Sequence, residues 1–149
     1  MKIKNQKEIL KNKTEFYEIL IENTRNYEGK FKEIVIHSPK IYNLLCELIE
    51  SNRLSKKYRN YVCSAIAYFI LPKDIFPENI FGAKGYIDDI YLSLYVLKEI
   101  EKEYEIEEIL DHWKYDLDLL KKLLERDFKL IDEEFGYILT EILEYVGIK

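Results

Sequence analysis

Apolar residues recur at intervals of three and four along most of the 149-residue chain, with few helix-breaking residues between them. This spacing places apolar side chains on one face of a helix, which must then be buried against other helices. Only five glycines and three prolines are present, too few for the many turns of a β-sandwich. The sequence therefore predicts a single all-α domain over residues 1–149, a compact bundle of five to six helices.

Six longer helices are predicted at residues 5–26, 39–51, 56–71, 86–100, 105–126 and 132–146, with a short helix or turn at 31–36. Ser38 is the expected N-cap of the second helix because its hydroxyl can accept a backbone N–H, and Pro39 suits the first helical position. Pro72 ends the third helix because the residue before a proline is pushed out of the helical region. The last helix is expected to begin at Asp132 and to end at Gly147, which tolerates a left-handed conformation.

The third helix and the two cysteines are expected to contribute to the core. The apolar spacing predicts that this helix buries Val62, Ala65, Ile66, Phe69 and Ile70. Cys46 and Cys63 fall within apolar helical patterns and lack the spacing of a metal or redox motif. We therefore expect two small buried residues rather than a disulfide.

Neither a signal peptide nor a membrane-spanning helix is predicted. The first residues carry no apolar core of the signal-peptide type. The longest uncharged run, Asn60–Pro72, has thirteen residues, fewer than the ~20 that a spanning helix needs. We expect a cytoplasmic protein, and peripheral contact with a membrane surface stays open.

Charge is divided unevenly between the two halves of the chain. Residues 1–60 hold 13 Lys and Arg against 8 Glu, whereas residues 61–149 hold 10 against 20 Asp and Glu. The densest basic cluster consists of Arg53, Lys56, Lys57 and Arg59. It has two interpretations: a binding site for phosphates or anionic lipid headgroups, or the solvated start of a helix. The net charge of −5 argues against general nucleic-acid binding.

The most distinctive stretch of the sequence is an acidic turn between the third and fourth long helices. Its characteristic residues are Pro72, Asp74, Pro77, Glu78, Gly85, Asp88 and Asp89. Asp74 can cap a short turn, and Gly85 permits a positive φ in a tight return. Carboxylates at the start of the next helix favourably meet the positive end of its dipole. These structural roles are sufficient, yet the same residues are the first candidates for a functional site.

Residues 68–78 read Tyr-Phe-Ile-Leu-Pro-Lys-Asp-Ile-Phe-Pro-Glu and are followed at 85–89 by Gly-Tyr-Ile-Asp-Asp. This pattern resembles the signature of the YkvA-like family of unknown function. The resemblance covers about residues 34–98 and leaves residues 101–149 as a C-terminal helical extension. Glu78 departs from the pattern, because the family most often has Asp there. Membership implies a compact helical domain, in some proteins attached to membrane-linked partners, and no known reaction.

A metal site is the sharper interpretation of the acidic turn. The four carboxylates of Asp74, Glu78, Asp88 and Asp89 would converge if the turn folds back between its two helices. Clustered carboxylates suit Mg²⁺, Mn²⁺ or Ca²⁺. The spacing is not that of an EF-hand loop, and capping hydrogen bonds account for the same residues without a metal. We therefore expect no cofactor and keep the metal site as the alternative.

Two functions of different classes follow from these observations. The favoured one is a non-enzymatic interaction module that binds a protein, a second copy of the chain as a homodimer, or an anionic surface. The alternative is a divalent-metal-dependent enzyme, for example a hydrolase, that uses the carboxylates of the 72–89 turn. No catalytic residue is identified, because neither His37 nor His112 has a visible partner motif for a nucleophile and base.

Overall fold

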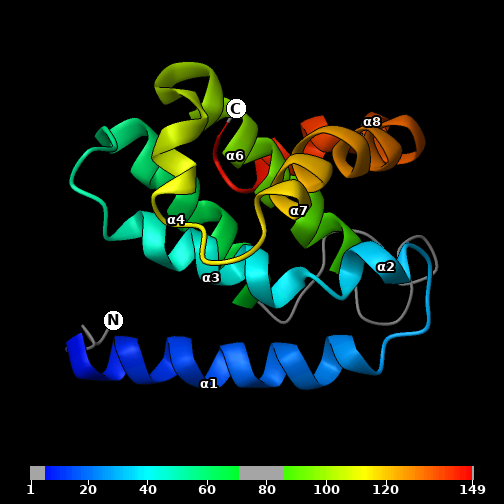
Figure 1. The fold of residues 1–149 in the computed structure, drawn as a ribbon, viewed down its shortest axis with the longest axis horizontal. Coiled ribbons are helices and arrows are strands. Elements are labelled where there is room, and N and C mark those ends of the chain that lie inside the picture. The colour runs from blue at the N-terminus through cyan, green and yellow to red at the C-terminus, as the bar shows by residue number, and fades with distance from the viewer. Residues whose placement is uncertain (1–5, 71–85, 149) are drawn as a thin grey trace.

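The computed structural model describes residues 6–70 and 86–148, with side chains from residue 15 onward (Figure 1). Its elements are α1 (Gln6–Arg25), α2 (Lys32–Val35), α3 (Ser38–Ile49), α4 (Lys56–Ile70), α6 (Tyr86–Leu110), α7 (Leu117–Lys122), the π-helical segment η1 (Leu123–Asp127) and α8 (Phe128–Tyr145). No β-strand occurs in these described ranges, and the predicted all-α class is confirmed. The predicted site residues Pro72, Asp74, Pro77, Glu78 and Gly85 lie outside the described residues.

Helix α6 lies at the centre of the bundle. Every residue from Tyr86 to Leu94 is buried, so the first turns of this helix are covered on all sides. The helices α3, α4 and α8 all pack against it, as the middle of Figure 1 shows. A helix that is mostly apolar all round is stable only in such a position. Each fully buried Leu or Ile contributes about 1.5–3 kcal/mol through removal from water.

Helix α1 forms an outer layer that packs chiefly against α3. In Figure 1 it lies as one long helix along the lower edge of the molecule. Leu20 is only 2% exposed, and the Phe16 and Tyr42 rings meet at 5.1 Å between centroids. Because α1 is covered on one side, its other side faces solvent.

The first half of the chain follows the predicted boundaries closely, with one correction at a helix start. Ser38 is not the N-cap of α3: His37 occupies that position, and Ser38 is the first helical residue. The buried Ser38 hydroxyl has no hydrogen-bond partner among the described residues. Pro39 is therefore the second helical residue rather than the first, and it still lies in the first turn. The proline therefore sets the start of the helix without help from a hydroxyl cap.

The prediction that a new helix begins near residue 105 is confirmed, but its continuation to residue 126 is wrong. Within α6 the helical conformation is broken at Glu105, whose backbone has φ 66° and ψ 172°, and the helical segment after it stops at Leu110. The apolar period hides this end because Ile109 and Leu120, on either side of the connection at residues 111–116, are both buried in one core. Periodicity reports which side chains face inward and does not show where the backbone turns.

A second break, which the apolar spacing did not predict, lies at residues 111–116. The Trp113 indole N–H donates to the Asp116 carbonyl at 2.9 Å, which closes the connection on itself. Asp116 then caps α7, because its carboxylate accepts the backbone N–H of Asp118 at 3.3 Å. An Asp that accepts a hydrogen bond from the second residue beyond it is a typical N-cap.

The predicted start of the last helix at Asp132 is also wrong. Helix α7 passes through η1 into α8 without interruption, so Asp132 lies inside a helix. Its carboxylate accepts a hydrogen bond from the Tyr91 hydroxyl of α6. Gly147 follows α8 with φ 84°, the left-handed conformation predicted for it.

Helix α4 buries Val62, Ala65 and Phe69, as predicted, whereas Ile66 is only partly buried. Ile70 is 44% exposed and Cys63 is also exposed, so two expected core positions are wrong. These two residues are seven apart and share an outward face of the helix. Tyr68 is buried instead, because its hydroxyl has a partner on α6.

Within the described ranges, no helix combines the length and the apolar character needed to cross a membrane. Helix α6 has 25 residues, but acidic residues occupy its first turn.

Candidate functional site

Asp88 and Asp89 lie in the first turn of α6, the position predicted for them. They are 0% and 5% exposed. The Tyr68 hydroxyl at the end of α4 donates to Asp88 Oδ2 at 2.5 Å, and the Asp89 backbone N–H donates to Asp88 Oδ1 at 3.1 Å. A buried carboxylate requires such donors, since an unpaired buried charge is strongly destabilising. Through these hydrogen bonds Asp88 links the start of α6 to the end of α4.

The metal site expected at the acidic turn is only half within the described part of the chain. Asp74 and Glu78 lie outside it, so the four-carboxylate arrangement stays a prediction. Among the described residues, no group of three or more His, Cys, Asp or Glu side chains is placed to hold a metal ion. Asp88 and Asp89 alone are too few ligands for a metal site.

The predicted basic cluster is divided by the fold. Arg53 turns to the end of α6 and forms ion pairs with Glu108 at 3.4 Å and with Asp111 at 2.9 Å. Glu108 is 6% exposed and also accepts the Ser51 hydroxyl at 3.0 Å. His112 Nε2 lies 3.9 Å from the same carboxylate. Arg53 is therefore a clamp that holds the α3–α4 connection against α6.

The other three basic residues lie on α4. Lys57 Nζ stands over the rings of Tyr58 and Tyr61, 5.3 and 5.8 Å from their centroids. Lys56 and Arg59 are exposed. This arrangement fits the interpretation as a solvated helix start, in which Lys56, Lys57 and Arg59 keep their charges and Arg53 alone of the four has an ion pair among the described residues.

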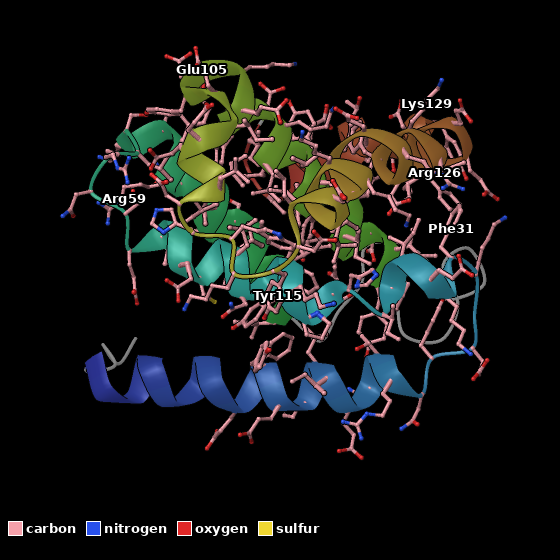
Figure 2. The ribbon with its side chains drawn as sticks, in the orientation of Figure 1. Phe31, Arg59, Glu105, Tyr115, Arg126 and Lys129 are labelled. Atoms are coloured by element: carbon pink, nitrogen blue, oxygen red, sulfur yellow. The ribbon has the colours of Figure 1, made fainter. Side chains whose placement is uncertain are left out.

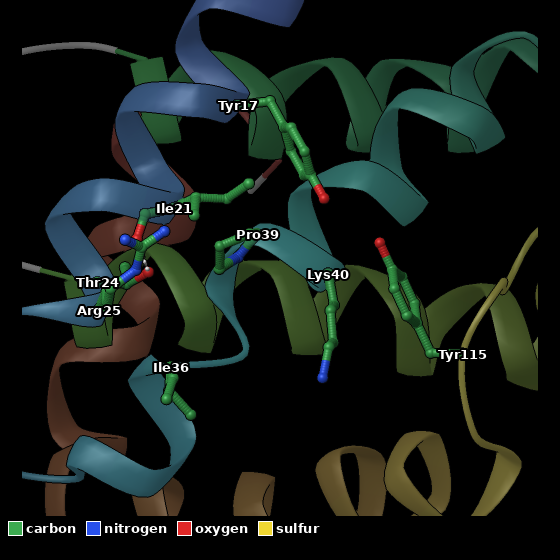
Figure 3. Close-up of a pocket in the computed structure, with 8 residues that line it drawn as sticks. All are labelled: Tyr17, Ile21, Thr24, Arg25, Ile36, Pro39, Lys40 and Tyr115. Atoms are coloured by element: carbon green, nitrogen blue, oxygen red, sulfur yellow. Dashed lines mark hydrogen bonds between the residues drawn. The ribbon is translucent and has the colours of Figure 1, made fainter.

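A hollow of about 260 Å³ opens between α1, the start of α3 and the connection before α7 (Figure 3). It is lined by Tyr17, Ile21, Thr24, Arg25, Ile36, Pro39, Lys40 and Tyr115, and we call it the α1–α3 hollow. Its α1 residues are spaced four, three and one apart, which places them on one face of that helix. Ile36 is 48% exposed although it is apolar. The lining is thus mostly apolar, and Arg25 and Lys40 are its two cations.

Among the described residues, Lys40 contacts an aromatic ring and an imidazole rather than an acid. Its Nζ lies 5.5 Å from the Tyr115 ring centroid and 3.4 Å from His37 Nδ1. Burial lowers the pKa of His37, and the nearby charges of Lys40 and Lys122 lower it further. The imidazole is therefore neutral at neutral pH, and a ring nitrogen can accept a hydrogen bond from Lys40.

Two tyrosines close one end of the hollow. The hydroxyls of Tyr17 and Tyr115 point toward each other from opposite walls (Figure 3). Burial raises the pKa of Tyr115 to about 12, and its hydrogen bond with Tyr17 adds to the rise. Trp113 packs against Tyr115 with ring centroids 5.0 Å apart. Tyr115 therefore stays neutral and does not offset the positive charge of the rim.

No local sequence pattern indicates this hollow. The spacing of its α1 residues is visible in the sequence, but the same spacing is typical of a core-facing stripe. Ile36 follows α2 and Tyr115 lies in the connection before α7, and no local pattern pairs either of them with α1. Only the packing of α1 on α3 assembles the site.

These features define an all-α protein with a buried carboxylate tie between two helices and a basic-rimmed apolar hollow on its surface. Residues 61–95 match a family model described as a protein of unknown function, DUF1232. An uncharacterized protein, ORF9, of Methanothermobacter thermautotrophicus is 30% identical over 127 residues, which cover 85% of this chain and 86% of that relative. The chain belongs to the same family as this archaeal protein. No solved structure matches the chain significantly.

The DUF1232 match spans the end of α4 and the start of α6, so it includes both Tyr68 and Asp88. It includes none of the residues that line the α1–α3 hollow. The hydrogen bond between Tyr68 and Asp88 therefore belongs to the segment that the family model describes. The residues that line the α1–α3 hollow come from the rest of the chain.

Proposed function

We propose that this protein is a non-enzymatic interaction module that binds an acidic protein segment at the α1–α3 hollow. The observation that carries the proposal is an apolar hollow with two cations that no carboxylate of the described residues neutralises. Arg25 and Lys40 form no ion pair with the described part of the chain. Both can therefore pair with acids of an incoming partner.

The size of the hollow favours a side chain over a complete small molecule. Its volume of about 260 Å³ lies below the roughly 300–1,000 Å³ of typical ligand pockets. Protein interfaces are commonly anchored by one apolar side chain in such a pocket, with charged residues around it. We expect an aliphatic or aromatic anchor next to Ile36 and acidic residues beside Arg25 and Lys40.

Charge reversal tests this assignment. The double variant Arg25→Glu/Lys40→Glu is compared with Lys56→Glu/Arg59→Glu, which makes the same change in charge on α4. The wild type and both variants are used to capture partners from the native cell extract, with quantification by mass spectrometry and a thermal-unfolding control for folding. A partner captured by the wild type is expected to be lost with the first variant and kept with the second. Its capture should also weaken as salt rises.

Two outcomes would contradict the proposal. One is a partner that both variants capture as well as the wild type does. The other is binding to vesicles of phosphatidylserine and phosphatidylcholine, but not to pure phosphatidylcholine, that is lost only with Lys56→Glu/Arg59→Glu. That second result would assign the function to an anionic lipid surface and to the basic residues of α4.

A divalent-metal-dependent enzyme remains the second candidate, since two adjacent acids are buried at the start of α6. Asp74 and Glu78 would have to join them to complete an oxygen-ligand set. The YkvA-like assignment of residues 34–98 is likewise part of the proposal, and the DUF1232 match at residues 61–95 supports it.

A further inference from the structure

A second hollow, of about 360 Å³, lies between the α2 segment and the helical stretch from Lys122 to Leu130, and it shares no residue with the first. It is lined by Phe31, Lys32, Glu33, Ile34, Lys122, Arg126, Asp127 and Leu130, and we call it the Arg126 hollow. Its volume falls within the range of small-molecule sites. Figure 2 shows Phe31 and Arg126 at the same end of the molecule, one from each wall.

The wall formed by η1 has an irregular backbone that decides which side chains meet. Lys122 Nζ pairs with Asp127 Oδ2 at 3.0 Å, although the two residues are five apart. In a regular α-helix such residues point about 140° away from each other. The wider π-helical turn of Leu123–Asp127 brings them to one side. The π-helical turn therefore lets Lys122 neutralise the buried Asp127. Arg126 is the other charged residue that this wall contributes to the hollow.

The opposite wall is irregular as well. Phe31 has φ 58° and ψ 34°, a left-handed conformation that costs a non-glycine residue about 1–2 kcal/mol. Its ring packs edge-on against Phe135 with centroids 6.3 Å apart. This packing keeps an aromatic surface beside Ile34 and Leu130, where an apolar body can rest. Left-handed residues and π-helical turns are both enriched at functional sites.

The three cations that line the Arg126 hollow differ in whether they already have an ion-pair partner. Lys32 is engaged by both carboxylate oxygens of Glu28, at 3.0 and 2.9 Å. Lys122 is engaged by Asp127. Arg126 forms no ion pair with the described part of the chain, and a guanidinium binds carboxylates and phosphates through two parallel N–H donors. Lys122 also retains N–H donors beyond the one that Asp127 uses.

We propose that the Arg126 hollow binds a small organic anion, a carboxylate or phosphate that carries an aromatic or aliphatic group. Arg126 takes the anionic group, Lys122 supports it, and the apolar group lies on Phe31, Ile34 and Leu130. Glu33 stands in the same lining and opposes the anion, so its charge weakens binding.

Titration with two probes tests the proposal. Phenyl phosphate carries the anionic group with an apolar body, and inorganic phosphate carries the group alone. Each is titrated by calorimetry into the wild-type chain and into Arg126→Gln, Glu33→Gln and Lys129→Gln. Lys129 is an exposed cation three residues from Arg126 that does not line the hollow, so it serves as the matched control. Lys122 is left unchanged, because its loss would leave Asp127 buried without a partner.

Phenyl phosphate is expected to bind one site saturably and more tightly than inorganic phosphate. Arg126→Gln should weaken it about tenfold or more, and Glu33→Gln should strengthen it about two- to fivefold. Lys129→Gln should have no effect. The proposal is overturned if phenyl phosphate shows no saturable binding, if inorganic phosphate binds equally well, or if Lys129→Gln and Arg126→Gln weaken binding equally.

Discussion

The Tyr68 hydroxyl donates to the Asp88 carboxylate at 2.5 Å between the end of α4 and the start of α6, and the two residues are 3% and 0% exposed. This hydrogen bond joins the two helices that flank the acidic turn. A short hydrogen bond to a buried carboxylate is strong because the charge polarises the donor and little water competes. It gives Asp88 a structural role that does not depend on a metal.

Removing this donor is expected to destabilise the fold. Tyr68→Phe keeps the ring and deletes the hydroxyl, so Asp88 loses a charge-assisted hydrogen bond. The free energy of unfolding should fall by about 1.5–3 kcal/mol. Urea unfolding measures the loss, with Tyr137→Phe as the control, because Tyr137 is 70% exposed. Equal stability of the two variants would show that the Tyr68 hydroxyl contributes nothing to the fold.

The kink in α6 predicts a stabilising substitution. Glu105 adopts φ 66° and ψ 172°, a region that glycine occupies freely and that costs other residues about 1–3 kcal/mol. Its side chain is exposed at the upper tip of the molecule (Figure 2). Glu105→Gly should therefore raise the free energy of unfolding by about 1 kcal/mol, after the entropy cost of glycine. Glu105→Ala keeps the strain and should give no gain; a gain as large for alanine would contradict the strained backbone.

The Arg53 clamp predicts a loss of stability rather than of anion binding. Arg53→Ala leaves the buried Glu108 with the Ser51 hydroxyl and without its cation. The expected loss is about 1 kcal/mol, reduced because 62% of the Arg53 side chain is exposed. Lys56→Ala should change the unfolding free energy by less than about 0.5 kcal/mol. If both variants were equally stable, Arg53 would belong with the solvated cations of α4.

Buried tyrosines predict that stability falls at alkaline pH. Burial raises the pKa of Tyr115 to about 12 from the ordinary value of 10.0, and it raises the pKa values of Tyr42 and Tyr91 further. Between pH 10 and pH 12 the unfolded chain has lost these protons while the folded chain retains them. Each such group therefore lowers the unfolding free energy as pH rises through that window.

Urea unfolding across this window measures the slope. Tyr115→Phe cannot ionise and should reduce the slope relative to wild type, whereas the exposed Tyr137→Phe should not. A wild-type stability that does not change from pH 10 to pH 12 would mean that these hydroxyls ionise alike in both states.

The metal alternative predicts stabilisation by a divalent cation. Millimolar Mg²⁺, Mn²⁺ or Ca²⁺ should raise the melting temperature of the wild type, because a ligand that binds only the folded chain stabilises it. Asp88→Asn should abolish the rise. Tyr68→Phe is the matched control, since it perturbs the same carboxylate without removing a ligand oxygen. No rise with any of the three ions would eliminate the metal-dependent enzyme.

Among the described residues, local sequence signals predicted the helix boundaries up to the break at Glu105 and failed between residues 111 and 132. The start of α3 at Ser38-Pro39 and the start of α6 near Asp88 rest on residues close in sequence. The connection at residues 111–116 and the π-helical turn before α8 have no such signal, because both arise where helices adjust to one core. Asp132 shows the same limit. The sequence predicts it as a helix start, whereas in the fold it lies inside α8 and accepts a hydrogen bond from Tyr91 of α6.

The candidate sites, like the helices, were predictable only where the relevant residues are close in sequence. By itself the sequence determined the all-α class and the position of Asp88 and Asp89 in the first turn of a helix, because spacing and helix-end preferences act over a few residues. Only the tertiary structure decided that Asp88 meets Tyr68, that Arg53 pairs with Glu108, and that two hollows form whose linings include a cation with no ion pair in the described part of the chain. These contacts join helices distant in sequence, and their partners are chosen by packing rather than by period.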